Sequence, residues 1–122
     1  MAGDANQENI MGDRANIHVK SENYEGVYFY THWEGRRLPQ TLQRALARKL
    51  RWDDEQYLNR IIFCEMIGKD TAGETGYGVT SYLCDNNHEI IEVDVDGQTI
   101  TIGNEVWTFD EFIKADLSGL EY

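Results

Sequence analysis

Residues 15–33 read ANIHVKSENYEGVYFYTHW, and this stretch decides the fold class. Apolar and polar side chains alternate with a period of two on both sides of the turn-forming segment 21–25, which predicts two strands joined as an antiparallel hairpin. When Ile17 is placed opposite Phe29, the apolar faces of the two strands coincide. The sequence therefore predicts both the strands and their register.

The opposite face of this hairpin carries a stripe of ring side chains. In the predicted register His18 lies beside Tyr28 on that face. Asn16 and Tyr30 form the next pair, and His32 follows one step further along the second strand. A face of this kind needs solvent, a covering element or a ligand against it. We expect a covering element, with a ligand pocket built on the two tyrosines and His32 as the alternative.

Two helices are predicted after the hairpin. The first begins at Pro39, because proline is favoured at the first helical position, and extends to about Arg51. It has one apolar face and an opposite ridge of arginines. The second helix ends at Gly68 and carries apolar residues around nearly its whole circumference, so we expect it to be buried on most sides. Glu65 falls within its apolar arc, where a carboxylate has to be paired, hydrogen-bonded or protonated.

The second half of the chain predicts more strands. Alternating residues indicate strands at about 77–84 and 89–95, followed by a strand that carries Ile100 and a closing strand at 106–107. Asp96-Gly97 predicts a two-residue type I′ turn that sets Val93 against Ile100. Thr108-Phe-Asp-Glu111 has the pattern of a capping box that opens a last short helix.

This element order predicts one α+β domain at residues 13–122, with a mostly antiparallel sheet of about six strands and the two main helices packed on one face. Residues 1–12 show no apolar periodicity, so we expect them to be a disordered leader. The longest apolar run, Ile61–Cys64, is too short to span a bilayer, which favours a soluble, cytoplasmic protein. Cys64 and Cys84 share no metal or redox motif, and we expect free, buried thiols.

Charge is distributed very unevenly along the chain. Residues 1–52 contain 8 Lys/Arg against 6 Asp/Glu, and residues 53–122 contain 3 against 16, so the two parts carry +2 and −13 of the total of −11. Such a field repels nucleic acid and anionic membranes and attracts basic protein surfaces. We therefore expect the partner-binding residues to be the acidic ones on and around the outer face of the later strands, namely Asp85, Glu89, Glu92, Asp94 and Asp96.

Four motifs of the chain resemble one known family. They are residues 11–17 (MGDRANI), 30–33 (YTHW), 60–66 (RIIFCEM) and 74–78 (ETGYG). Together they are similar to a family of small proteins of unknown function from bacteria, archaea and phages, and the resemblance covers nearly all of the chain after Met11. It implies no activity, cofactor or site residue. It does imply a mobile or viral gene as one source, a setting in which compact acidic inhibitors of host defence complexes are common.

Three function classes follow from these observations. We expect a non-enzymatic protein-binding inhibitor of the anti-CRISPR or DNA-mimic type, which needs no cofactor and whose acidic face binds a basic surface of a nucleic-acid-binding complex. The alternative is a small-ligand or nucleotide-binding module built from Tyr28, Tyr30, His32, Glu65, Glu74 and Tyr77.

A small enzyme is the second alternative. It would use His32 and Glu65 as an acid-base pair, provided that the fold brings them within hydrogen-bond reach. No metal motif supports a metalloenzyme: Asp94-x-Asp96-Gly97 lacks the remaining ligands of a calcium loop, and Asp85-Asn-Asn-His88 is typical of a plain turn.

Overall fold

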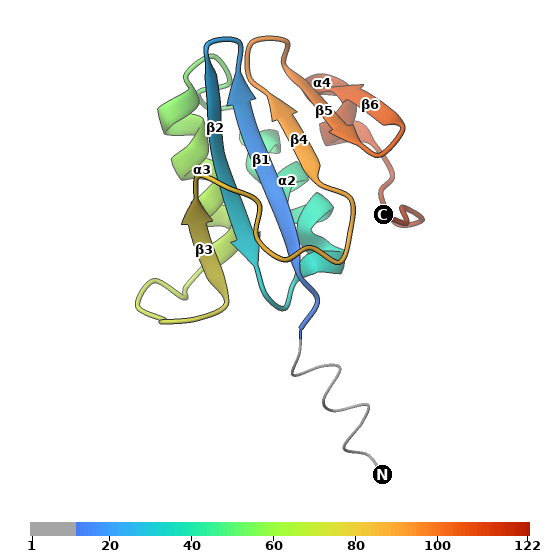
Figure 1. The fold of residues 1–122 in the computed structure, drawn as a ribbon. Helices are drawn as coiled ribbons and strands as arrows, with labels where there is room; N and C mark the ends of the chain where they lie inside the picture. Colours follow the sequence, from blue (N-terminus) through green and yellow to red (C-terminus); the bar gives the residue numbers. More distant parts are fainter. Residues whose placement is uncertain (1–11) are drawn as a thin grey trace.

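A six-stranded mixed sheet with three helices on one face organises the chain (Figure 1). The structure is a computed structural model and describes residues 12–122. Its strands are β1 (Ala15–Ser21), β2 (Tyr24–Thr31), β3 (Tyr77–Thr80), β4 (Ile91–Asp94), β5 (Thr99–Ile102) and β6 (Glu105–Thr108). Its helices are the 3-10 turn η1 (Gly35–Arg37) and the α-helices α2 (Leu38–Ala47), α3 (Glu55–Ile67) and α4 (Phe109–Lys114). The predicted α+β class is confirmed, and the proposed leader lies almost entirely outside the described residues.

The sheet has the strand order β3-β2-β1-β4-β5-β6. Four neighbouring pairs are antiparallel, as expected, whereas β1 and β4 run parallel. Parallel neighbours need a crossover connection. Here the segment 81–90 leaves β3 at one edge, passes over the side of the sheet opposite the helices and enters β4 (Figure 1). We call this side the open face and the segment 81–90 the crossover.

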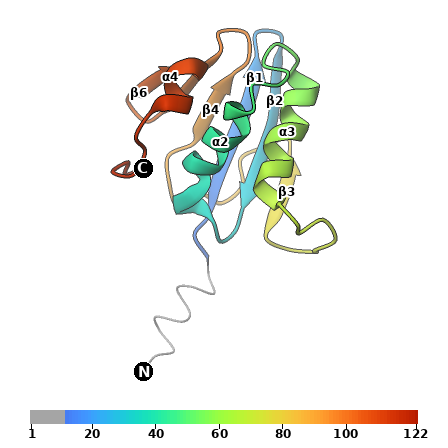
Figure 2. The same cartoon turned by 180° about the vertical axis from the view of Figure 1, so that it is seen from behind.

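The core lies between the other side of the sheet and the helices (Figure 2). Both predicted registers are confirmed, because Ile17 pairs with Phe29 and Val93 pairs with Ile100. These side chains alternate toward the helices and pack against apolar residues of α2, α3 and α4. The largest side chains that are fully buried there are Phe109, Phe112, Ile17, Leu38, Leu42, Leu46, Leu58 and Ile62.

Both long helices differ from the sequence-based expectation. Helix α2 ends at Ala47 instead of about Arg51, because the backbone leaves the helical region at Lys49 (φ 55°) and Arg51 (φ 60°). Helix α3 ends before Gly68 as predicted but buries one stripe, Leu58, Ile62 and Met66, rather than most of its surface. It covers the β2 and β3 end of the sheet, so only one of its sides meets the core (Figure 2). Both cysteines are free thiols, but the expectation that they are buried is wrong for Cys64, which is exposed because it lies outside the buried stripe of α3; Cys84 is half-buried.

Two predictions about the later strands are wrong in detail. The strand expected at 77–84 stops at Thr80, because the chain turns there into the crossover. The turn after β4 has four residues, and its positive φ is at Gln98 (φ 52°) rather than at Asp96 and Gly97. The reason is that the Val95 amide donates to the Lys20 carbonyl at 3.0 Å, which keeps Val95 attached to β1 beyond the hairpin. The capping box of Thr108 and Glu111 is confirmed.

Candidate functional site

The predicted acidic residues lie on β4, beside its two ends and on the crossover. Ile91 and Val93 are buried against the helices, so Glu92 and Asp94 point to the opposite side, where they pair with threonines of β5. Glu89 precedes the strand and Asp96 follows it, while Asp85 lies on the crossover above the sheet. We call these five residues, Asp85, Glu89, Glu92, Asp94 and Asp96, the acidic column.

Contacts within the chain hold part of the acidic column in place. Glu92 Oε2 lies 2.9 Å from His18 Nδ1 and 3.8 Å from Lys20 Nζ. Asp94 accepts a hydrogen bond from the Gly97 amide at 3.2 Å, and Asp96 accepts one from the Glu22 amide at 2.5 Å. Asp85, Glu89 and Asp96 are exposed. The column therefore presents three exposed carboxylates to solvent, of which Asp96 is held by a hydrogen bond, and Lys20 offsets part of the Glu92 charge.

The crossover is the covering element expected over the aromatic stripe. Asn16, fully buried, donates from its side-chain amide to the carbonyls of Cys84 and Asp85 at 3.3 and 3.2 Å. The rings on either side of this contact are separated into two groups. His18 stacks on Tyr28 with ring centroids 4.2 Å apart, whereas Tyr30 and His32 form a second group. The stripe is thus not one continuous binding surface.

Tyr30, His32 and Trp33 line a pocket of about 520 Å³ together with residues 75–77. The Tyr30 hydroxyl lies 2.8 Å from His32 Nδ1, and the His32 amide donates to the Gly76 carbonyl at 2.9 Å. Gly76 adopts φ 102°, and a Cβ there would lie 3.0 Å from the Trp33 ring, so only glycine fits this lip. Burial raises the pKa of Tyr30 although the nearby Arg14 opposes the shift. We call this hollow the ring pocket.

The ring pocket unites only part of the residues predicted for a ligand site. Tyr30, His32 and Tyr77 line it, and the exposed Glu74 belongs to the adjoining loop. Tyr28 lies apart from it, against His18. Burial raises the pKa of Tyr77, and the carboxylates of Glu34 and Asp70 add to that shift.

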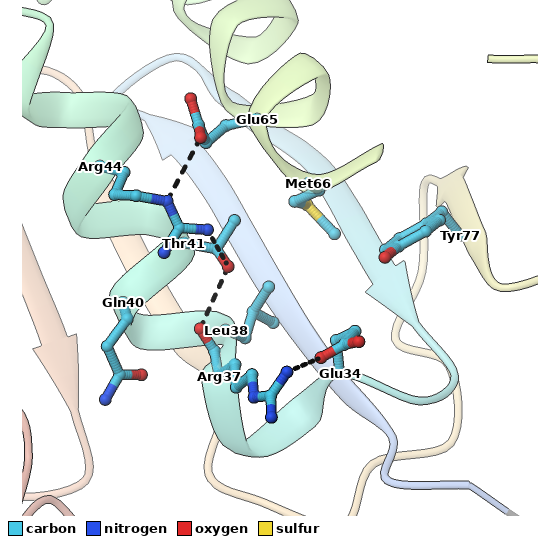
Figure 3. A pocket seen from close by; sticks show the side chains of 9 residues that line it. All are labelled: Glu34, Arg37, Leu38, Gln40, Thr41, Arg44, Glu65, Met66 and Tyr77. Atoms are coloured by element: carbon cyan, nitrogen blue, oxygen red, sulfur yellow. Dashed lines mark hydrogen bonds and ion pairs between the residues drawn. The ribbon is translucent and has the colours of Figure 1, made fainter. Parts of the chain in front are cut away.

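Glu65 lies on the helix side of the sheet, in a groove of about 480 Å³ between α2, α3 and β3 (Figure 3). Its carboxylate accepts a hydrogen bond from Arg44 Nε at 3.3 Å, and Arg44 also donates to Thr41. Of the three states open to a carboxylate in the apolar arc, the structure shows pairing, but Glu65 is half-buried rather than buried because α3 buries only one stripe. Because His32 is on the other side of the sheet, the structure does not bring the two members of the suggested acid-base pair together.

A second cluster had no counterpart in the sequence-based expectations. His88 Nε2 lies 2.5 Å from Asp13 Oδ1, and the Arg36 amide donates to Asp13 Oδ2 at 2.7 Å. Burial works against ionisation of Asp13, but these hydrogen bonds outweigh it and lower its pKa. The His88 ring stacks on Tyr122, whose hydroxyl donates to the Gly35 carbonyl and whose pKa burial raises strongly.

This cluster, which we call the Asp13 clamp, joins the start of β1 to η1, the crossover and residue 122. No local sequence pattern predicts the Asp13 clamp, because Asp13 and His88 are 75 positions apart in the chain. Both oxygens of the Asp13 carboxylate have a hydrogen-bond partner in the cluster. Across residues 12–122 no group of three or more His, Cys, Asp or Glu side chains is arranged to hold a metal ion.

Within the described part of the chain, no helix is long and apolar enough to cross a membrane. Comparison of the chain with protein-family models, with curated proteins and with solved structures found no match. The resemblance to a family of small uncharacterised proteins stays a prediction.

Proposed function

We propose that the protein is a non-enzymatic acidic module that binds a basic surface of a partner protein through its open face. The observation that carries the proposal is the acidic column: Glu92 and Asp94 point from β4 to the side of the sheet that the described helices leave uncovered, Asp85 lies on the crossover of that side, and the exposed Glu89 and Asp96 flank the strand. A net charge of −11 adds long-range attraction to a basic partner.

The spacing of Glu92 and Asp94, the two column residues at alternate positions of β4, suggests the class of partner. Carboxylates on alternate strand residues lie about 6.7 Å apart, roughly two steps of the 3.4 Å axial rise per phosphate of one DNA strand. The carboxylate spacing is therefore compatible with a basic channel that binds the phosphates of a nucleic-acid backbone. We propose an inhibitor of a cytoplasmic nucleic-acid-binding complex, such as a phage-encoded inhibitor of a host defence complex.

A defined cationic probe tests this proposal. Fluorescently labelled nona-lysine should bind the protein and lose affinity steeply between about 50 and 200 mM salt, since surface attraction is screened over a Debye length. The double variant Asp85→Asn with Glu89→Gln should weaken binding, because both side chains are exposed members of the column. The matched control, Glu105→Gln with Glu121→Gln, removes two exposed charges outside the column.

Equal weakening by the two double variants would show that only net charge matters and would remove the acidic column from the proposal. Capture of partners from a cell lysate over the same salt range complements the peptide. Recovery of only neutral or acidic proteins, held equally well in high salt, contradicts the proposed function.

The ring pocket supports a second candidate, the binding of a small planar ligand. Tyr30, His32 and Trp33 offer rings for stacking in a hollow of about 520 Å³. If a nucleotide is the ligand, a panel of nucleotides should raise the melting temperature, by the equivalent of about 2.7 kcal/mol at 100 times the dissociation constant. Tyr30→Ala should abolish the shift, and an unchanged melting temperature across the panel contradicts nucleotide binding.

A further inference from the structure

A groove of about 570 Å³ lies beside the acidic column, between the β1–β2 turn and the start of the crossover. Its walls are Tyr24, of which 71% is exposed, and Tyr82, of which 67% is exposed, with Leu83 beside them. Aromatic side chains that stay this accessible and share one hollow mark an interaction surface rather than core packing. We call this hollow the tyrosine groove.

The floor of the tyrosine groove is held in a fixed orientation. Tyr28 and His18 form it; their rings are stacked, with planes only 3° from parallel and centroids 4.2 Å apart. His18 in turn lies between Glu92 Oε2 at 2.9 Å and the Glu25 carbonyl at 2.5 Å. Because both ring nitrogens are engaged, the floor loses little side-chain freedom when a partner binds.

The rim of the groove is negatively charged. Glu22 and Glu25 are exposed in its lining, and Glu92 lies next to its floor. Lys20 also lines the groove, but its ammonium lies 3.8 Å from the Glu92 carboxylate, which offsets its charge. Even with His18 protonated, these three carboxylates outnumber the two cations. A phosphate-bearing ligand is therefore repelled, and a cation is attracted.

Aromatic walls combined with carboxylates fit one cation better than the others. A guanidinium is planar, stacks on aromatic faces and donates two parallel hydrogen bonds to a carboxylate, whereas an ammonium acts as a strongly hydrated point charge. The same chain shows the contact once already, because the guanidinium of Arg51 lies 4.8 Å from the centre of the Tyr57 ring.

We propose that the tyrosine groove is the anchoring site for an arginine side chain of the basic partner. The inference rests on the proposed function and deepens it: the acidic column attracts the partner from a distance, and the groove selects arginine at contact. Both features share one structural link, since Glu92 belongs to the column and also holds His18 in the floor.

Binding of labelled nona-arginine and nona-lysine, measured by fluorescence anisotropy at about 100 mM salt, tests the inference. Tyr24→Ala and Tyr82→Ala should each weaken nona-arginine binding about fivefold, because each removes one cation–π face. The same variants should leave nona-lysine binding within about twofold. Tyr82→Trp should keep or tighten the binding of nona-arginine, since tryptophan provides the strongest such face.

Tyr57→Ala is the matched control, because Tyr57 is 49% exposed, lies on α3 on the helix side and already has Arg51 over its ring. It should not change the binding of either peptide. All four tyrosine variants keep the charge of the chain, and their thermal unfolding shows whether they are folded.

The outcomes separate the groove from the proposed function. If Tyr24→Ala and Tyr82→Ala leave the arginine preference intact, the groove is not the anchor, while salt-sensitive binding that depends on the acidic column still upholds the proposed function. Loss of arginine preference in Tyr57→Ala also overturns the groove. If neither peptide binds at about 50 mM salt, both the groove and the proposed function are refuted.

Discussion

The two faces of the sheet are completed in different ways. The side toward α2, α3 and α4 is apolar and largely covered, whereas the open face is crossed by a single irregular segment that is held at Asn16 and by the Asp13 clamp (Figures 1 and 2). Hydrophobic burial on the first side supplies most of the stabilisation. The open face is therefore free to carry exposed carboxylates and rings that contribute little to folding.

The largest loss of stability is expected from a substitution on the covered side of the sheet. Phe112→Ala should lower the free energy of unfolding by about 3–5 kcal/mol, because Phe112 is fully buried and its removal leaves a cavity. The exposed Tyr82→Ala serves as the control on the open face and should stay within about 0.5 kcal/mol of the wild type. Denaturant midpoints measure both. Similar losses in the two variants would contradict the division of labour between the faces.

A smaller loss of stability is expected at Asn16, where the crossover is attached to the open face. Asn16→Ala should cost about 1–3 kcal/mol, since it removes a buried side chain and leaves the carbonyls of Cys84 and Asp85 without their donor. Amide exchange at residues 81–86 should speed up, whereas His88 is still held by the Asp13 clamp. Thr101→Ala, on the same face but away from the crossover, should leave exchange at 81–90 unchanged. Protection that survives Asn16→Ala would show that other contacts hold the crossover.

The Asp13 clamp should make stability depend on pH in the acid range. The folded pKa of Asp13 lies below its unfolded value, so its contribution is fully present above the unfolded pKa of about 3.9 and is lost as the pH falls through the lower folded pKa. Asp13→Asn should flatten this part of the profile of unfolding free energy against pH. His88→Gln, which removes the partner, should do the same. A profile of Asp13→Asn that superimposes on the wild-type curve contradicts the clamp.

The smallest effect is expected at Glu65. Its side chain is 28% exposed and that of Arg44 is 59% exposed, so their pair should contribute only about 0.2–1 kcal/mol. A double-mutant cycle with Glu65→Gln and Arg44→Ala isolates this coupling in denaturant unfolding. A coupling free energy well above that range would mean that the groove of Figure 3 shields the pair from water.

The sequence predicted the features that depend on residues close together in the chain, namely strand register and helix ends. The register of β1 with β2 and of β4 with β5 follows from alternation, because a slip of one residue would turn every apolar side chain to the open face. The capping box at Thr108 and the helix end at Gly68 are equally local. These elements make up most of the sheet and two of the helix boundaries.

The remaining features depend on partners far along the chain. The early end of α2, the position of the crossover and the Asp13 clamp are set by contacts that no short window contains. For the same reason the candidate site could be foreseen only in part. The alternation of β4 placed Glu92 and Asp94 correctly on one face, whereas the separation of Tyr28 from Tyr30 and the walls of the tyrosine groove depend on where residues 81–85 cross the sheet.

The parallel pairing of β1 with β4 also has a consequence for how the chain folds. β1 and β2 are neighbours in sequence and can pair early in folding. The other edge of β1 pairs with residues 91–94, which lie more than seventy positions further along the chain, so this pairing forms later. During synthesis on the ribosome this edge, with Ile17 and Val19 beside it, stays unpaired until residues 91–94 have emerged. Nascent chains are therefore most open to wrong strand pairing at the centre of the finished sheet, not at its margins.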